Sequence, residues 1–334
     1  MFLRLILFLF FCSFLINDVF ASDTPPNTEW YKQYSLTKTS KYSSLFDSHI
    51  TFYQLDNDHS EYITLVHGVG GSAKDFEAII PYLEQQYNLL LVDLPGYGAS
   101  EKANSINSPS RYATALKQLL PKIIKNKTYL VGHSMGGNVS LQLTAMSPNL
   151  IHKLILIDPA GFLNKFAYSK HLASNQIADI PFVKSYAPKL KNLIHNITDI
   201  LPDPSSILLS KMGRQHILKE DVNYISAISL MSEDLTNVVR KIDVPTLIIW
   251  GKDDPVMPYQ SMYMLKHTIK KAETFLFNKA GHSPQKQHPH KVSTLIDNFL
   301  ISDTAKNRFK SKSINGDVMI DCDNQQNLAQ LSNG

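Results

Sequence analysis

The sequence contains little cysteine and little excess charge. Its 334 residues include two cysteines, and 33 Lys and Arg against 29 Asp and Glu give a formal net charge of +4. No Cys/His cluster has the spacing of zinc ligands, so we expect no structural metal. No dense run of Lys and Arg is present either, which argues against nucleic acid as the main partner. A chain of this length, 43% hydrophobic and 19% charged, is sufficient to bury a large core.

The most apolar run lies at the N-terminus. One positive charge precedes Leu5–Ile16, which is almost wholly apolar, and the segment ends at Ala21 with residues that a signal peptidase accepts. We therefore predict a signal peptide over residues 1–21, export to the periplasm or the exterior, and a mature chain from Ser22. The alternative is an uncleaved membrane anchor, although the run is short for a span of about 20 residues. Cleavage would remove Cys12 and leave no pair for an intrachain disulfide.

Beyond a polar arm at residues 22–48, β-rich runs alternate with helical patterns. Strands are expected at 49–55, 62–68, 88–96, 128–134, 153–161, 245–251 and 273–278, and helices near 73–87, 110–126, 135–147, 258–271 and 288–301. The later strand runs are continuously apolar, as strands covered on both faces must be. This alternation predicts an α/β fold with a mostly parallel central sheet flanked by helices.

The alternation breaks once, between residues 162 and 240. This segment has a helical pattern that includes an apolar stripe from Leu190 to Ile197. We predict a helical cap here, inserted between a first core part at 49–161 and a second core part at 241–301. Two roles fit the stripe, the cap's own core or the lining of a ligand pocket, and the pattern leaves both open. Residues 302–334 form a polar, amide-rich tail that we expect to be mobile.

Residues 131–138, VGHSMGGN, place Ser134 between two glycines where a predicted strand ends and a predicted helix begins. In a strand-to-helix turn of the form Gly-x-Ser-x-Gly, the serine is strained and its hydroxyl is exposed at the sheet edge. Side chains at Gly132 and Gly136 would strike the neighbouring strand and helix. A glycine-rich turn without a catalytic role is the alternative for a lone match, but the flanking elements are those that the motif requires. We predict that Ser134 is a nucleophile.

A serine hydroxyl becomes a good nucleophile when a base takes its proton, and a third group must orient that base. Among the twelve histidines, we predict His282 as the base because it follows the last predicted strand. His133 adjoins the serine, and we expect its side chain to point away. For the acid we predict Asp254, in the loop after a predicted strand. Asp158, which ends the preceding strand, is the main alternative, and Asp253 is a weaker one.

The negative oxygen of a tetrahedral intermediate needs hydrogen-bond donors. We predict the backbone N–H of Met135, directly after the serine, and that of Val69 in the glycine-rich segment HGVGGS. Removing one such donor raises the transition-state energy by about 3 kcal/mol. The same segment lacks the Lys-Ser/Thr of a phosphate-binding loop and the spaced acidic residue of a dinucleotide site, so we expect no cofactor.

The order Ser134, Asp254, His282 and the segments HGVGGS, DLPGYGAS, GHSMGG, WGKDDPVMP and AGHSPQ resemble those of the α/β-hydrolases over about residues 49–301. LIDPAGF, followed by a cap of this length and VPTLIIWGKDD, is similar to the pattern of bacterial lipases and monoacylglycerol lipase-like hydrolases. The resemblance implies an α/β-hydrolase fold and a lipase or esterase that forms an acyl-enzyme on Ser134. It also implies a small acyl ester or acylglycerol as substrate, with transient contact to a lipid surface.

This fold hosts several reactions, so other activities stay open. Cofactor-free haloperoxidases share the triad. Hydrolases of carbon–carbon bonds typically have Trp directly after the catalytic histidine, where this chain has Ser283. Haloalkane dehalogenases and epoxide hydrolases need a carboxylate nucleophile, which argues against both. A catalytically silent binding protein is a further alternative, although such a protein would be expected to lack a triad member, and none is missing.

Overall fold

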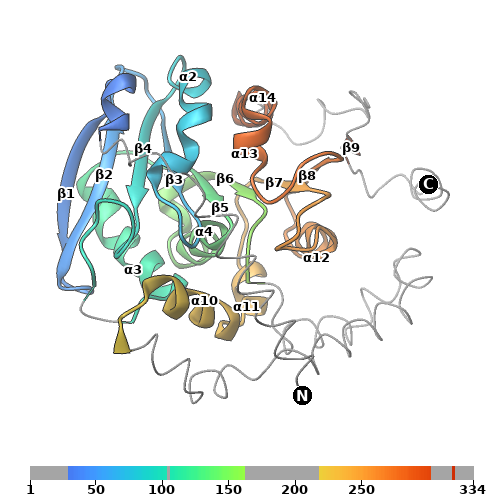
Figure 1. Ribbon diagram of the computed structural model, residues 1–334. Helices are drawn as coiled ribbons and strands as arrows, with labels where there is room; N and C mark the ends of the chain where they lie inside the picture. The colour runs from blue at the N-terminus through green and yellow to red at the C-terminus, as the bar shows by residue number, and fades with distance from the viewer. Residues whose placement is uncertain (1–28, 104–105, 162–217, 302–317, 320–334) are drawn as a thin grey trace.

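The computed structural model describes residues 29–103, 106–161, 218–301 and 318–319 (Figure 1). The predicted signal peptide lies outside the described residues, as do most of the predicted cap and most of the predicted tail. Within the described ranges, no helix is long and apolar enough to cross a membrane. No group of three or more His, Cys, Asp and Glu side chains in those ranges could hold a metal ion.

A single sheet organises the described chain. In sequence order its strands are β1 (Thr37–Ser43), β2 (Ser48–Leu55), β3 (Tyr62–Val66), β4 (Asn88–Asp93), β5 (Thr128–His133), β6 (Ile151–Ile157), β7 (Thr246–Gly251), β8 (Ala272–Phe277) and β9 (Val318–Met319). They lie side by side in the order β1-β2-β4-β3-β5-β6-β7-β8-β9. Along this order β4 to β8 run parallel, whereas β1, β2 and β9 are antiparallel to their neighbours. The predicted mostly parallel α/β sheet is confirmed.

Helices cover both faces of the sheet (Figure 1). One face carries η2 (Ala73–Ile79), α2 (Ile80–Leu83) and α14 (Pro289–Ile301), and the other carries α3 (Pro109–Leu119), α4 (Met135–Met146) and α12 (Gln260–Thr268). Shorter helices are η1 (Trp30–Tyr34), η3 (Leu120–Lys122), η4 (Pro148–Leu150) and α13 (Pro284–Gln287). Two helices, α10 (Val222–Ser232) and α11 (Thr236–Val239), fall within the range predicted for the cap. Of these, α10 contacts α3, and α11 contacts α4.

Side chains along β4 show how the two core layers form. Leu90 and Val92 belong to the layer that includes α3, α4 and α12. Leu89 and Leu91 belong to the layer beneath η2, α2 and α14. Successive side chains of a strand point to opposite faces, so a strand between two helical layers must be apolar at every position. Full burial of one leucine stabilises the fold by about 1.5–3 kcal/mol, which makes these strands a rigid base for the loops at their ends.

The segment predicted as a polar arm at residues 22–48 contains an additional strand. Thr37–Ser43 pairs with β2 and forms the edge of the sheet. Most of its residues are exposed or half-buried, so its composition is polar and no apolar pattern marked it in the sequence. Ahead of this strand, Trp30 is buried, and its ring lies 5.3 Å from that of Tyr53 on β2. The described part of the predicted arm, from residue 29 onward, therefore packs on the sheet and extends it by one strand.

Helix α4 begins directly after the turn that follows β5 and lies close against the sheet. A Cβ atom added at Gly136 would lie 2.0 Å from the carbonyl oxygen of Val66 on β3, and one added at Gly132 would lie 2.3 Å from the carbonyl oxygen of Gly136. The facing atoms are backbone, so they cannot move aside as a flexible side chain would. The predicted steric role of the two glycines is confirmed. Their close approach holds the start of α4, and with it Ser134, at the carboxyl edge of the sheet.

Gly136→Ala is expected to lower the free energy of unfolding by about 1–3 kcal/mol, the range for overpacked sites. The Val66 carbonyl cannot yield without disturbing the pairing of β3 with β4 and β5. Urea unfolding followed by circular dichroism measures the change. Gly281→Ala is the matched control, because its Cβ would have its nearest neighbour at 3.5 Å. An equal loss of stability in the two variants would contradict the steric explanation.

Candidate active site

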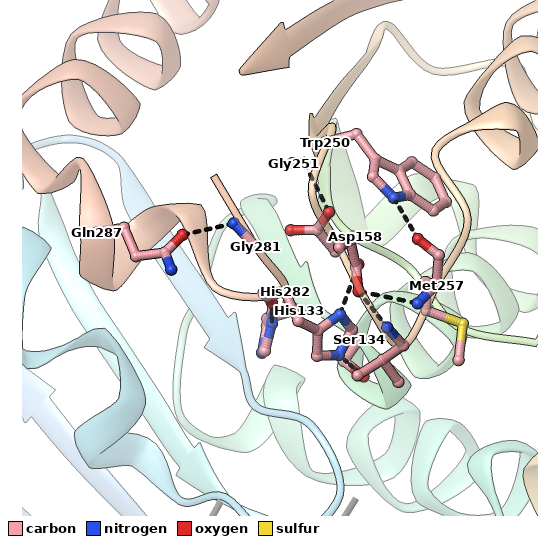
Figure 2. Close-up of polar contacts among 11 residues, drawn as sticks. His133, Ser134, Asp158, Trp250, Gly251, Met257, Gly281, His282 and Gln287 are labelled. Carbon is pink, nitrogen blue, oxygen red and sulfur yellow. Dashed lines mark hydrogen bonds and ion pairs between the residues drawn. The ribbon is translucent and has the colours of Figure 1, made fainter. Parts of the chain in front are cut away.

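Three side chains from separate loops meet at the carboxyl edge of the parallel strands (Figure 2). Ser134 follows β5, Asp254 follows β7 and His282 follows β8. The His282 ring lies between the other two. Its Nε2 is 2.9 Å from the Ser134 hydroxyl, and its Nδ1 is 2.7 Å from Oδ2 of Asp254. The structure thus brings the predicted nucleophile, base and acid into one chain of two hydrogen bonds.

The backbone of Ser134 has a positive φ of 53°, with ψ −120°. For a non-glycine residue this conformation costs about 1–3 kcal/mol and persists only where the surroundings fix it. The Ser134 N–H donates to the carbonyl of Ile157 on β6 at 3.0 Å. Its own carbonyl accepts from Gly137 at 2.9 Å and from Ala160 at 3.0 Å. Bonds to β6, to the loop after it and to α4 therefore keep the turn sharp.

Hydrogen bonds hold both oxygen atoms of the Asp254 carboxylate. Its Oδ1 accepts from the backbone N–H of Val256 at 2.7 Å and of Met257 at 2.9 Å, while Oδ2 faces Nδ1 of His282. The indole N–H of Trp250 donates to the Met257 carbonyl at 3.0 Å, which anchors the loop to β7. Three donors around one buried carboxylate leave both of its oxygen atoms with hydrogen-bond partners. A carboxylate acceptor in turn fixes the ring proton on Nδ1, so that Nε2 is free to accept from the serine.

Asp158, the alternative acid, contacts the backbone of β7. It is fully buried, and its Oδ1 accepts the Gly251 N–H of β7 at 2.8 Å. Burial raises the pKa of Asp158 well above its ordinary value, the charge of Asp254 raises it further, and the Gly251 N–H opposes both. Among the described residues, no hydrogen bond joins Asp158 to His282, and its contact is with the backbone of β7. Asp253 is exposed, so Asp254 is the carboxylate that the structure brings to His282.

The two predicted oxyanion donors lie beside Ser134. Met135 is the first residue of α4, and a Cβ atom added at Gly68, the residue before Val69, would lie 2.9 Å from the Ser134 Cβ. Within the described part of the chain, neither the Val69 nor the Met135 N–H donates to an acceptor. Neither N–H is therefore committed to an acceptor among the described residues, as a donor to an oxyanion must be. The N-terminal end of α4 adds a field that favours negative charge there.

The ring of His67 fixes the backbone that leads to Val69. His67 is fully buried, and its Nε2 accepts the Leu94 N–H at 3.0 Å. The ring proton is therefore on Nδ1, which donates to the Gly68 carbonyl at 2.7 Å. The Gly71 N–H donates to the same carbonyl at 3.2 Å. With its carbonyl held from two sides, Gly68 has a fixed backbone beside Ser134.

His133 also contributes to the site, which the sequence reasoning missed. We expected its side chain to point away from that of Ser134, which left its partner open. Its Nε2 lies 2.6 Å from the backbone carbonyl of His282, and the two imidazole rings are 5.1 Å apart. Burial, and next the neighbouring His282, lower the pKa of His133 to about 3. The ring is therefore neutral, and Nε2 carries the proton that it donates. The sequence position of His133, directly before Ser134, was the one indication of a role in the site. It did not indicate which group the His133 side chain would contact.

A mostly parallel sheet with a serine at the turn after β5, an acid after β7 and a histidine after β8 defines a serine hydrolase of the α/β-hydrolase fold. A family model described as "Serine aminopeptidase, S33" matches residues 57–286, and the chain belongs to that family. The esterase EaEST from Exiguobacterium antarcticum shares the fold, with a TM-score of 0.59 and 20% identity over 80% of this chain and 100% of that chain.

Two curated relatives have different reactions in their names. Lipase 3 of Moraxella sp. (strain TA144) is 27% identical over 234 residues, which cover 69% of this chain and 74% of that protein. The 2-hydroxy-6-oxononadienedioate/2-hydroxy-6-oxononatrienedioate hydrolase of Escherichia coli (strain K12) is 28% identical over 254 residues, 72% of this chain and 87% of that protein. The names of these relatives therefore agree on a hydrolase and differ in the substrate.

The raised pKa of Asp158 gives the fold a pH dependence that Asp158→Asn tests. Above its ordinary pKa of 3.8 and below its raised native pKa, the native state keeps a proton that the unfolded state has released. The stability of the wild type is therefore lost as pH rises through this window, by up to about 1.4 kcal/mol per pH unit. The Asn variant cannot titrate here, so its stability relative to wild type should increase as the pH rises above the ordinary pKa of 3.8. Urea unfolding over a series of pH values from about 4 upward measures this, and a constant difference between the two proteins would contradict a raised pKa of Asp158.

Proposed function

We propose that the protein hydrolyses carboxylic esters with apolar acyl groups, acylglycerols among them, through an acyl-enzyme on Ser134. The observation that carries the proposal is the unbroken chain of hydrogen bonds from the Ser134 hydroxyl through the His282 ring to the Asp254 carboxylate. Ser134 is the nucleophile, His282 is the general base and acid, and Asp254 orients the ring. The N–H groups of Val69 and Met135 bind the oxyanion.

In acylation, Oγ of Ser134 attacks the ester carbonyl carbon while Nε2 of His282 takes the hydroxyl proton. The carbonyl oxygen becomes negative and accepts from the two backbone N–H groups. The Asp254 carboxylate stabilises the imidazolium without taking its proton. The C–O bond to the leaving group then breaks, and His282 gives its proton to the departing alkoxide. An alcohol leaves, and the acyl group stays on the serine.

In deacylation, a water molecule takes the place of the alcohol. His282 accepts a proton from the water as its oxygen attacks the acyl carbon, and the same oxyanion donors bind the second tetrahedral intermediate. The bond to Oγ of Ser134 breaks, and His282 returns the proton to Oγ. A carboxylic acid is released, and the hydrogen-bond chain is restored for the next substrate.

An apolar acyl group has support from the relatives and from the site. The Moraxella relative is named a lipase, and the Exiguobacterium protein that shares the fold is named an esterase. Two partly exposed apolar side chains lie in the loops of the site and pack on the core. Val69 is in the loop of the proposed oxyanion donor, and Met257 is in the loop that carries Asp254. An acyl chain that leaves water for such surface gains about 25 cal/mol for each Å² buried.

Cleavage of a carbon–carbon bond is the second candidate, because the Escherichia coli relative is named for the hydrolysis of a 2-hydroxy-6-oxo dienoate. The residue after His282 favours the ester reaction over it. Ser283 stands there, where the resemblance to carbon–carbon bond hydrolases would lead us to expect Trp.

A fluorophosphonate probe is expected to label wild-type protein on Ser134 and to leave Ser134→Ala unlabelled, because the probe needs a serine activated by a base. With p-nitrophenyl esters, kcat/KM should rise from acetyl to octanoyl and longer chains, and monoacylglycerols should be cleaved.

Asp254→Asn should lower kcat by about 10⁴-fold through loss of the correct ring tautomer. Asp158→Asn should stay within about ten-fold of wild type, because its carboxyl does not contact the ring.

Each part of this proposal would be contradicted by a different experimental result. Failure to label folded wild-type protein would remove the serine chemistry altogether. A preference for acetyl esters would indicate a short-chain esterase. Faster turnover of a 2-hydroxy-6-oxo dienoate than of any ester would establish the second candidate. If Asp158→Asn abolished activity and Asp254→Asn left it intact, the two acids would have to exchange roles.

We also propose that the protein acts outside the cytoplasm after removal of residues 1–21. The support is the apolar run Leu5–Ile16 and the cleavage pattern that ends at Ala21. Expression of the full chain in a bacterial host, followed by mass determination of the exported protein, should give a chain that starts at Ser22. An intact N-terminus in a membrane-bound product would instead support the anchor.

A further inference from the structure

The backbone of His282, and not its ring alone, is tied to the strand that carries the nucleophile. His282 lies in the loop between β8 and α13, and its carbonyl is 2.6 Å from Nε2 of His133, the last residue of β5. In the sheet, β6 and β7 separate these two strands. Since a carbonyl can only accept, His133 donates. One side chain thus joins two distant loops at the point where Ser134 and His282 must meet (Figure 2).

We propose that His133 is a positioning residue: its imidazole donates from Nε2 to the His282 carbonyl and so sets where the His282 ring stands between Ser134 and Asp254. The kinetic part of this inference rests on the proposed function. The structural part rests on the contact itself.

The other bonds in this region do not replace that contact. The Gly281 N–H donates to the side-chain oxygen of Gln287 at 2.8 Å, and the Asp253 N–H donates to the Ala280 carbonyl at 2.9 Å. The first bond lies between the loop after β8 and helix α13, and the second joins that loop to the loop after β7. His133 supplies the link to β5, and a catalytic group misplaced by about 1 Å can lower the rate by about 10²-fold.

The donor must also be neutral. His133 is 6% exposed, and within the described residues its Nδ1 has no hydrogen-bond partner. A proton on Nδ1 would leave a buried N–H unpaired. It would also place a positive charge beside the His282 ring, 5.1 Å away, which must itself become positive when it takes the serine proton. Histidine supplies a long-reaching donor here without a charge, which lysine or arginine could not do.

Three titratable groups face His133 from the elements packed against it. His282 lies in the loop after β8, Asp75 in η2 and Lys286 on α13. Nζ of Lys286 is 2.6 Å from Oδ1 of Asp75, so their opposite charges largely cancel at His133. Burial and His282 therefore dominate, and they lower the pKa of His133 to about 3. His133 stays neutral throughout the pH range in which an ester hydrolase of this kind is assayed.

His133→Gln and His133→Asn form a matched pair that tests this role. Both side chains end in a neutral amide donor, but that of Gln reaches about as far as histidine Nε2, and that of Asn is one methylene shorter. We expect kcat of the Gln variant within about three-fold of wild type and kcat of the Asn variant lower by about ten-fold or more, with KM little changed. The acid limb of the kcat/KM profile should keep its position in the Gln variant, because His133 does not titrate there.

Two further readouts do not need the natural substrate. The rate of fluorophosphonate labelling at Ser134 should follow the same order, with wild type and Gln above Asn. The low-field NMR signal of the His282 Nδ1 proton should persist in the Gln variant and shift or vanish in the Asn variant. Thermal melting followed by circular dichroism should show the same folded content in both.

The results separate this inference from the proposed function. If wild type is labelled but cleaves no ester, the proposed function fails, and the labelling order still tests His133. If wild type is not labelled, the NMR signal carries the test alone. Wild-type behaviour in both variants, a Gln variant as impaired as the Asn variant, or an acid limb displaced in the Gln variant would each overturn the role of His133.

Discussion

The positive φ of Ser134 is the constraint on which the site depends. It is unfavourable for a serine, and it persists because β6, the loop after it and α4 fix its N–H and carbonyl. The position of helix α4 is restricted by the close packing of Gly136 against the Val66 carbonyl. Once this turn closes, the hydroxyl, the Met135 N–H and the start of α4 share one location. The acid and the histidine then need only reach it from the loops after β7 and β8.

The Asp254 carboxylate lies near two buried groups whose pKa values are shifted toward their neutral forms. Asp254 accepts three hydrogen bonds, while burial raises the pKa of its neighbour Asp158 and lowers that of His133. Charges interact strongly where water is excluded. A second negative charge beside Asp254, or a positive charge beside His282, would disturb the proton transfer between serine and histidine. The two neutral neighbours therefore leave that transfer to a single ion pair.

Features that are local in the chain could be predicted from the sequence. Continuous apolar runs marked the strands between two helical layers, and the glycines around Ser134 marked the turn. Strand β1 could not be recognised, because an edge strand exposes most of its side chains. Asp254 and Asp158 both follow strands, and the choice between them depends on where backbone N–H groups converge. The contact of His133 with His282 could not be predicted, because its acceptor is a backbone carbonyl in a loop three strands away in the sheet.

His133 and Ser134 are consecutive residues, and both contact His282, one at its carbonyl and the other at its ring. Together the three residues close a loop of covalent and hydrogen bonds. Members of a closed loop cannot rotate independently, so the torsions of the His282 side chain are restricted before any substrate arrives. The entropy of holding the imidazole is therefore lost once, when the chain folds, and not again in each turnover.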